Sequence, residues 1–268
     1  MTLAQATKVY VAKLTAAGVQ GAKLDAELLI AYVTGKNRAW VLAHPEESLT
    51  TTQTTQLEQL VAKRAARHPL VHLTGNREFY GLNFAITPDV LTPRVETEQM
   101  VEWVIADAPK NARCIDIGTG SGAIAVAIVK HRPDIEMWAT DVTDEALAVA
   151  KRNIKAHSVE VKLLKSDLFE RVDAKFDVVA TNLPYLQDDA DLMPEVQKEP
   201  AIALHGGKDG LTLYRRFLKQ LPAHLKPDGK LYTECDPWQQ ADLAETAAEQ
   251  GLAKIRENYF IMGFQEQS

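Results

Sequence analysis

Residues 114–122 read Cys-Ile-Asp-Ile-Gly-Thr-Gly-Ser-Gly, an apolar strand pattern that runs straight into three closely spaced glycines. Glycines let the backbone turn tightly and approach a ligand without a Cβ atom in between. A helical pattern follows at about 121–131, so the glycines occupy a turn between a strand and a helix. In open α/β sheets such a turn borders a ligand-binding crevice. The stretch therefore predicts a ligand site at the carboxyl end of a parallel strand, the alternative being a glycine-rich turn that binds nothing.

Apolar runs and helical stretches alternate on both sides of this turn. This alternation is typical of βαβ units, which build a parallel sheet covered by helices on both faces. The fold class is therefore α/β, a doubly wound sheet. We expect strands at 112–117, 135–140, 159–164, 176–181, 229–234 and 252–260, and helices at about 121–131, 144–156, 208–222 and 237–250.

Upstream of the sheet the pattern is helical. Apolar residues recur at helical spacing from Leu3 to Ala17, from Leu24 to Tyr32 and from Leu57 to Ala65. Aromatic strand residues around Gly81 then predict a β-hairpin over residues 78–86. We therefore expect three parts: a small N-terminal helical bundle at 1–75, a β-hairpin linker at 76–95 and a catalytic domain at 96–268.

Composition favours a globular protein of the cytoplasm. Of 268 residues, 46% are hydrophobic and 25% are charged, which is the globular average. No apolar run approaches the roughly 18–20 residues that span a bilayer, and the N-terminus lacks a signal-peptide pattern. Cys114 and Cys235 are too few for a disulfide framework or a zinc site, so we expect reduced core thiols. We expect no metal and no membrane partner, and we expect a monomer.

Charge is distributed unevenly along the chain. Residues 1–75 hold eight Lys and Arg against five Asp and Glu, a balance of +3, whereas residues 76–268 hold 22 against 31, a balance of −9. An enzyme that acts on nucleic acid is expected to have a basic groove that neutralises phosphates. The acidic balance of the predicted catalytic part therefore argues against a direct nucleic-acid partner, and the basic helical part suits an acidic protein surface.

Three carboxylates stand at the ends of successive predicted strands. Asp116 precedes the first glycine and suits an amino-bearing ligand, and Asp141 lies where ribose hydroxyls are bound in nucleotide sites. Asp167 is positioned to accept a hydrogen bond from an adenine amino group, with Leu168 or Phe169 packed on the ring. Because the glycine spacing also satisfies the dinucleotide fingerprint, a nicotinamide-dependent oxidoreductase remains an alternative.

The predicted strand at 176–181 runs directly into Asn182-Leu183-Pro184-Tyr185. The Asn182 side-chain oxygen and the Leu183 carbonyl before proline can each accept one N–H of a planar NH₂ group, and the Tyr185 ring offers a stacking face. An amide or aromatic amine is a poor nucleophile. Two acceptors placed where positive charge develops on nitrogen would stabilise the transition state more than the ground state. The tetrapeptide therefore predicts a site for group transfer to such a nitrogen.

The segment from Asp116 to Gly122, with Asp141, resembles the S-adenosylmethionine site of class I methyltransferases. The resemblance implies a seven-stranded, mostly parallel sheet with one antiparallel strand near the C-terminus. It also implies S-adenosyl-L-methionine as the cofactor and Asp141 on its ribose. The remaining implied cofactor contacts are Gly118, Thr119, Gly120, Ser121 and Gly122 along the methionine part, with Asp167, Leu168 and Asn182.

The tetrapeptide resembles the signature of methyltransferases that act on nitrogen in a planar group. These include adenine-N6 enzymes on DNA or RNA and glutamine-N5 enzymes on proteins, in which proline is usual where Leu183 stands. Residues 72–98 and 199–215 are similar to segments of the protein-(glutamine-N5) methyltransferases that modify peptide chain release factors. This resemblance implies methylation of a glutamine side-chain amide in a release factor.

Two further expectations concern the linker, and two further functions stay open beside the oxidoreductase. We expect Arg94 and Glu96 to brace one another or to position the linker beside Asn182, and Phe79 to wall the acceptor pocket. An adenine-N6 methyltransferase is the first alternative function. A binding module that keeps the fold without catalysis is the other.

Overall fold

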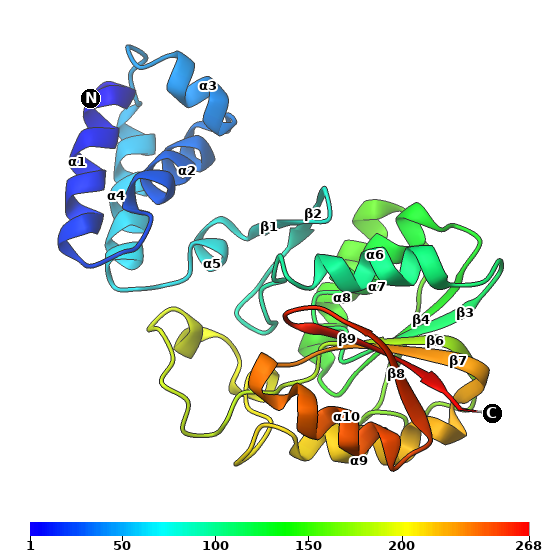
Figure 1. Ribbon diagram of the computed structural model, residues 1–268. Helices are drawn as coiled ribbons and strands as arrows, with labels where there is room; N and C mark the ends of the chain where they lie inside the picture. Colours follow the sequence, from blue (N-terminus) through cyan, green and yellow to red (C-terminus); the bar gives the residue numbers. More distant parts are fainter. Residues whose placement is uncertain (268) are drawn as a thin grey trace. The chain divides into compact units, whose positions relative to one another are not determined.

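The computed structural model describes residues 1–267, which form two compact units. The helical unit consists of Met1–Gly75 together with Leu192–Lys198, and the α/β unit consists of Asn76–Asp191 and the residues from Glu199 onward. Figure 1 shows the helices α1 to α5 of the helical unit in blue and cyan, its segment Leu192–Lys198 in yellow, and the sheet of the α/β unit in green to red. No helix within residues 1–267 is long and apolar enough to cross a membrane.

The helical unit packs its helices around one apolar core. The predicted runs correspond to α1, α2 and α4, whose capping boxes or αL glycines mark their ends. The short helices α3 and α5 are not predicted, because five or six residues are too few to establish a helical period. The bounds are α1 Leu3–Ala16, α2 Ala22–Thr34, α3 Arg38–Ala43, α4 Thr51–Ala65 and α5 Leu70–Thr74.

A cluster of ion pairs holds the distant segment Leu192–Lys198 in the helical unit. Arg67 makes a two-point contact with Glu195, its Nε and Nη2 lying 2.6 and 2.7 Å from the two carboxylate oxygens. Arg64 donates from Nη1 to Glu195 at 2.8 Å and from Nε to Asp25 at 2.6 Å. The side chains of Arg64, Asp25 and Glu195 are largely buried. Glu195 therefore fastens a segment that follows the tetrapeptide by only a few residues.

The α/β unit is built on a seven-stranded sheet with the order β5-β4-β3-β6-β7-β9-β8. Six of the strands point the same way and β9 runs antiparallel to them, which confirms the fold that the resemblance implies. The strands are β3 Arg113–Ile117, β4 Glu136–Asp141, β5 Lys162–Lys165, β6 Phe176–Thr181, β7 Leu225–Glu234, β8 Leu252–Glu257 and β9 Ile261–Glu266.

Helices cover both faces of this sheet. In Figure 1, α6, α7 and α8 lie on one side of the strands and α9 and α10 on the other. Short 3-10 helices punctuate the loops, at Val196–Lys198, Ala201–Ala203 (η2), Leu221–Ala223 and Pro237–Gln239. The α-helices are α6 Glu98–Asp107, α7 Ala123–His131, α8 Asp144–His157, α9 Thr212–Gln220 and α10 Gln240–Ala248.

One predicted strand is wrong in its extent. The apolar run at 252–260 is not a single strand, because β8 ends at Glu257 and the chain turns before β9 begins at Ile261. At this turn the Asn258 amide donates to the Ile261 carbonyl and its side-chain oxygen accepts from the Phe260 amide. The local hydrogen bonds of an asparagine turn therefore override an apolar pattern that reads as continuous.

The predicted hairpin is present as β1 Asn76–Phe79 and β2 Leu82–Ala85. Tyr80 and Gly81 connect the two strands with φ angles of 50° and 70°. Two successive positive φ values are typical of a type I′ turn, the tight connection whose twist matches that of the strands. Asn153 of α8 fixes the hairpin to the α/β unit, because its side chain accepts from the Ala85 amide and donates to the Ala85 carbonyl.

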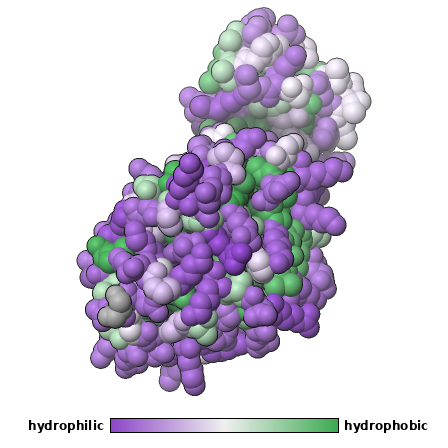
Figure 2. All heavy atoms as spheres, turned by 90° about the vertical axis from the view of Figure 1, so that its right-hand side faces the viewer, coloured by the Kyte–Doolittle hydropathy of each residue, from purple (hydrophilic) through white to green (hydrophobic). Residues whose placement is uncertain are grey.

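Apolar side chains are gathered inside each unit. Phe176, Phe217 and Phe264 are fully buried in the core of the α/β unit, and Leu14 and Leu57 are fully buried in the helical unit. The face seen in Figure 2 is mainly hydrophilic, with hydrophobic side chains restricted to patches. Cys114 and Cys235 are both buried and unpaired, and burial raises the pKa of each thiol to about 12.

We predict that Glu195→Gln destabilises the protein by about 2 kcal/mol at pH 7, the size of a charge-assisted hydrogen-bond pair. The hydrogen bond from Arg67, above all, holds the pKa of Glu195 at about 2, below its ordinary value of 4.5. Its contribution to stability is therefore present above pH 4.5 and is lost as the pH falls through 2. Thermal unfolding at pH 7 and pH 3 measures this difference.

In the Glu195→Gln variant, trypsin should also cleave segment 192–198 more readily, at the peptide bond that follows the exposed Lys198. The matched control is Asp191→Asn, which neutralises an exposed carboxylate in the same loop. Equal melting temperatures and equal cleavage rates for the wild type and Glu195→Gln would contradict the claim that Glu195 fastens segment 192–198 to the helical unit.

Candidate active site

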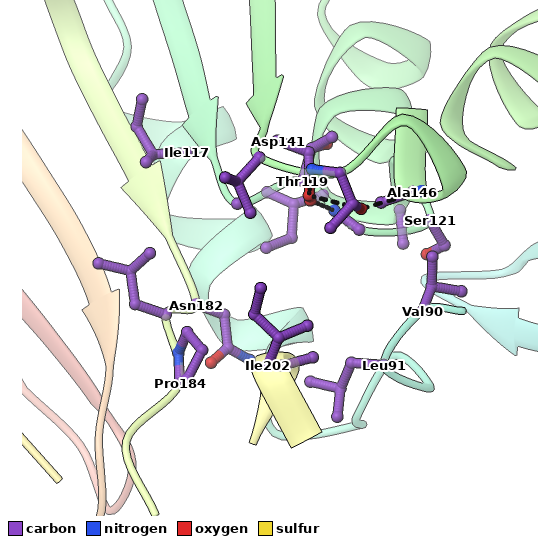
Figure 3. A pocket seen from close by; sticks show the side chains of 18 of the residues that line it. Val90, Leu91, Ile117, Thr119, Ser121, Asp141, Ala146, Asn182, Pro184 and Ile202 are labelled. Carbon is purple, nitrogen blue, oxygen red and sulfur yellow. Dashed lines mark hydrogen bonds between the residues drawn. The ribbon is translucent and has the colours of Figure 1, made fainter. Parts of the chain in front are cut away.

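A cavity of about 300 Å³ opens at the carboxyl ends of the parallel strands. Its wall is formed by the glycine-rich turn after β3, the end of β4, the turn after β5 and the start of the tetrapeptide after β6. The linker contributes Val90 and Leu91, and η2 contributes Ile202. In Figure 3 these side chains and those of Asp141 and Asn182 surround an open centre. The edge that the sequence predicts as a crevice is therefore hollow.

The glycine-rich turn meets the cavity with only part of its length. Gly118 and Gly120 line it, with φ angles of 73° and 53°, and a Cβ at Gly120 would meet no atom within 4 Å. Thr119 and Ser121 also line the cavity. Gly122 does not: a Cβ there would lie 3.2 Å from the Cα of Ala150. Gly122 therefore permits close packing of α7 on α8, whereas Gly120 leaves space for a ligand.

Asp141 ties the glycine-rich turn to the end of β4. Its Oδ2 accepts from the Gly120 amide at 2.9 Å, and its Oδ1 accepts from the amide and hydroxyl of Thr143 at 3.1 and 3.2 Å. The side chain also lines the cavity. Because each carboxylate oxygen has two lone pairs, Oδ1 is fully used by Thr143, whereas Oδ2 can accept a further hydrogen bond from a ligand hydroxyl.

Asp116 lies beneath the turn rather than in the cavity. It is fully buried, and its Oδ2 accepts from the Thr119 hydroxyl at 2.6 Å. Burial raises the pKa of this carboxyl to about 7, although the hydrogen bonds from Thr119 and the Ala125 amide oppose the increase. Asp116 is therefore not part of the cavity wall, and the structure gives no support to the expectation that it faces an amino-bearing ligand.

The turn after β5 brings a carboxylate and an apolar side chain to the cavity. Asp167 and Leu168 both line it, and Arg216 lies 2.8 Å from the Asp167 carboxylate. Leu168 is buried and adopts a φ of 50°, a conformation that is uncommon for a bulky residue. Phe169 is buried in the core and stacks on Phe217, so of the two candidates only Leu168 reaches the cavity.

The tetrapeptide presents three of its four residues to the cavity. Asn182, Leu183 and Pro184 line it, whereas Tyr185 packs against the core and donates its hydroxyl to Glu234. The proposed stacking face of Tyr185 is therefore not part of the cavity wall. Its hydroxyl is held in the interior, where burial, above all, raises its pKa far above the ordinary value.

The backbone after the tetrapeptide is held by a glycine-rich segment and a buried glutamine. A Cβ at Gly206 would overlap the Pro184 carbonyl oxygen, and a Cβ at Gly210 would overlap that of Tyr185. Gln239 is fully buried and donates from Nε2 to the Tyr185 carbonyl at 2.9 Å. Glycines at these positions let two loops approach to backbone contact.

Glu234 is a carboxylate behind the cavity that no sequence motif marks as functional. It ends β7, is 1% exposed, and accepts from the Thr97 hydroxyl at 2.6 Å and from the Tyr185 hydroxyl at 3.0 Å. Burial raises its pKa, and hydrogen bonds from Thr97, Tyr185 and Asn182 oppose the increase. The sequence signal that could have marked it is an acidic residue at the end of an apolar strand.

The linker forms one lip of the cavity. Arg94 lines the cavity and forms an ion pair with Glu199 at 2.5 Å. The Glu199 side chain is almost fully buried. The expected brace between Arg94 and Glu96 is therefore replaced by a pair with a distant segment, and Glu96 lies in a separate surface groove. Phe79 does line the cavity. Within residues 1–267 no cluster of His, Cys, Asp and Glu has the arrangement of a metal site.

Comparison with known families covers most of the chain. Residues 5–75 match the family described as PrmC N-terminal domain, and residues 97–204 match the family described as Methyltransferase small domain.

Individual relatives agree with the family matches. The chain is 39% identical over 221 residues to a release factor glutamine methyltransferase of Geobacter sulfurreducens, covering 81% of this chain and 78% of that protein. The release factor glutamine methyltransferase of Cereibacter sphaeroides is 38% identical over 260 residues, which is 95% of this chain and 93% of that protein.

Among solved structures, the T. thermophilus 16S rRNA N2 G1207 methyltransferase in complex with AdoMet and guanosine has a TM-score of 0.55. It is 15% identical in sequence, and the match covers 72% of this chain and 50% of that one. At this level of identity the likeness shows that the fold is shared.

We predict that Asp116→Asn removes a pH dependence of stability. The raised pKa means that folded Asp116 keeps its proton up to about pH 7, whereas the unfolded chain loses it near pH 4. As the pH rises from about 4 to about 7, the wild type should therefore lose up to about 1.4 kcal/mol of its free energy of unfolding per pH unit relative to the variant. Denaturant unfolding from pH 4.5 to pH 7.5 measures the difference. Parallel curves for the two proteins would contradict this, and exposed Asp173→Asn is the control.

Proposed function

This chain belongs to the release factor glutamine methyltransferase family, and from that we propose which of its residues carry the reaction. It transfers a methyl group from S-adenosylmethionine to the side-chain amide nitrogen (N5) of a glutamine in a peptide chain release factor. Membership of this family argues against a nicotinamide-dependent oxidoreductase and against a binding module that keeps the fold without catalysis. The roles of individual residues are proposals that rest on their position in the cavity.

We assign the cofactor to the part of the cavity between the glycine-rich turn and the turn after β5. The open space at Gly120 suits a ligand that approaches the backbone closely, and Asp141 Oδ2 has a free lone pair that can accept from a ribose hydroxyl. Leu168 supplies an apolar surface for the adenine ring, and Asp167 an acceptor for its amino group. S-adenosylmethionine supplies an electrophilic methyl group on a positively charged sulfur.

We assign the acceptor glutamine to the part of the cavity beside Asn182. The Asn182 Oδ1 atom and the Leu183 carbonyl oxygen each accept one N–H of the glutamine amide. These two bonds hold the nitrogen in line with the methyl group, and such positioning is the main requirement when the donor is already a good electrophile. As nitrogen gains the methyl group and positive charge, both acceptors bind it more strongly, and the surplus proton then leaves to solvent.

Leu183 instead of proline is compatible with this assignment. The proposed acceptor at this position is the backbone carbonyl, which leucine and proline share. The Leu183 side chain is buried, and a Cβ on Gly118 would lie 3.4 Å from its Cδ2 atom, so it packs beside the glycine-rich turn. A leucine here fills space between the cofactor region and the acceptor region.

We also propose how the three parts of the chain divide the work. Residues 1–75 dock the release factor, residues 76–95 form the linker, and residues 96–268 perform the transfer. The charge balance of +3 in the first part and −9 over residues 76–268 supports a protein substrate over a phosphate-rich one. We propose that the protein acts in the cytoplasm as a monomer, without direct contact to nucleic acid.

Mass spectrometry of a release factor after incubation with this protein and S-adenosylmethionine tests the substrate and the site. We expect one methyl group on one glutamine side chain. Asn182→Ala should reduce kcat by about 10²–10³, the usual loss for one aligned polar contact in a transition state. Binding of S-adenosylhomocysteine, measured by calorimetry, should persist in the variant.

The matched control is Asn83→Ala, which removes an exposed asparagine of β2. A parallel reaction with undermodified ribosomal RNA and tritiated cofactor addresses the adenine-N6 alternative. Label that enters only the RNA would overturn the proposal, as would full activity of Asn182→Ala on the release factor.

A further inference from the structure

Glu234 is a buried carboxylate whose surroundings contain donors but no cation. Its side chain lies outside the cavity wall, so it does not touch a ligand there. Within residues 1–267 no Lys or Arg forms an ion pair with it. Its two oxygens accept from the hydroxyls of Thr97 and Tyr185, and the Asn182 side chain also interacts with it directly. A buried charge without a partner of opposite sign is costly, and only such donors offset the cost. Packing alone therefore does not explain why a carboxylate lies at this position.

The hydrogen bonds of Thr97 give that reason. A threonine hydroxyl has one hydrogen, and here it is donated to Glu234 Oε2. The Thr97 oxygen can then only accept, and it accepts from Asn182 Nδ2 at 3.3 Å. If the Asn182 amide were reversed, its oxygen would face an oxygen that has no hydrogen to give. The carboxylate therefore sets the direction of the whole chain of hydrogen bonds, and Asn182 must turn Nδ2 inward.

With Nδ2 turned inward, Asn182 has its Oδ1 atom left for the acceptor. This orientation matters because a glutamine NH₂ group needs an acceptor, and the amide nitrogen of Asn182 would repel its hydrogens. Tyr185 is fixed by the same carboxylate, since its hydroxyl donates to Glu234 Oε1. The two ends of the tetrapeptide are thus held by one side chain, which comes from the end of a different strand.

We propose that Glu234 is a positioning residue that, directly and through Thr97, orients Asn182 so that the site presents only acceptors to the substrate amide. The proposal rests on the function assigned above and extends it to specificity. The Asn182 oxygen, the Leu183 carbonyl and the buried carboxylate behind them form a negative environment. It favours a primary amide, whose nitrogen becomes positive during transfer, and disfavours a carboxylate such as glutamate.

Three variants separate this role from a purely structural one. Thr97→Val keeps the size of the side chain but removes the hydroxyl, and Thr97→Ser restores it. Glu234→Gln keeps the size of the carboxylate but replaces one acceptor by a donor. We expect Thr97→Val and Glu234→Gln each to lower kcat for a release factor by about tenfold to a hundredfold, while Thr97→Ser keeps kcat within about twofold of the wild type, as expected for a contact worth about 1.4–2.7 kcal/mol.

The test depends on a fall in kcat that is not accompanied by changes in binding or stability. KM for the release factor, the Kd for S-adenosylhomocysteine and the melting temperature should change little, because none of them depends on the direction of the Asn182 amide. The double variant Thr97→Val/Glu234→Gln should be no slower than the slower single variant, because both changes interrupt one chain.

Two results would overturn the proposal. One is an unchanged kcat in both single variants. The other is a loss of kcat that comes only with weaker S-adenosylhomocysteine binding or a lower melting temperature, which would mean a structural role. The product formed by the wild type distinguishes this failure from failure of the proposed function. If the wild type methylates glutamine and the variants are equally active, only the role of Glu234 is refuted. If the wild type methylates no glutamine, both the role of Glu234 and the proposed function are refuted.

Discussion

An amide nitrogen accepts a methyl group only where its surroundings tolerate growing positive charge, and this requirement shapes the carboxyl edge of the sheet. The Asn182 oxygen and the Leu183 carbonyl meet it directly. Glu234 meets it from behind, as a buried carboxyl group that is 1% exposed at the end of β7. The hydroxyls of Thr97 and Tyr185 in turn supply hydrogen bonds to its two buried oxygens. One carboxylate therefore connects a strand of the sheet, the start of α6 and the tetrapeptide.

The sheet and the position of the cavity are predictable from sequence because their signals are local. A strand pattern, closely spaced glycines and a helical pattern stand next to one another at 114–131, and parallel topology then brings the strand ends to one edge. Asp141, Asp167 and Asn182 were expected at that edge and do line the cavity.

The remaining features depend on partners that are distant in sequence. Thr97 and Glu234 are 137 residues apart, and Arg67 and Glu195 are 128 apart, so no window of sequence contains either pair. The glycine pattern predicts Gly122 as a ligand contact, because such a pattern does not reveal which glycine faces a ligand and which faces a helix. Tyr185 was read as a stacking face for the same reason: the direction of its ring is set by the Glu234 carboxylate and the surrounding core.

A crystal structure of this protein with S-adenosylhomocysteine and a glutamine-containing release factor tests the central claim most directly. We expect the glutamine amide nitrogen to lie about 3 Å from both the Asn182 Oδ1 atom and the Leu183 carbonyl oxygen, with Asn182 Nδ2 directed to Thr97. A complex in which that nitrogen contacts neither acceptor, or in which Asn182 presents its own NH₂ group to the substrate, would contradict the account.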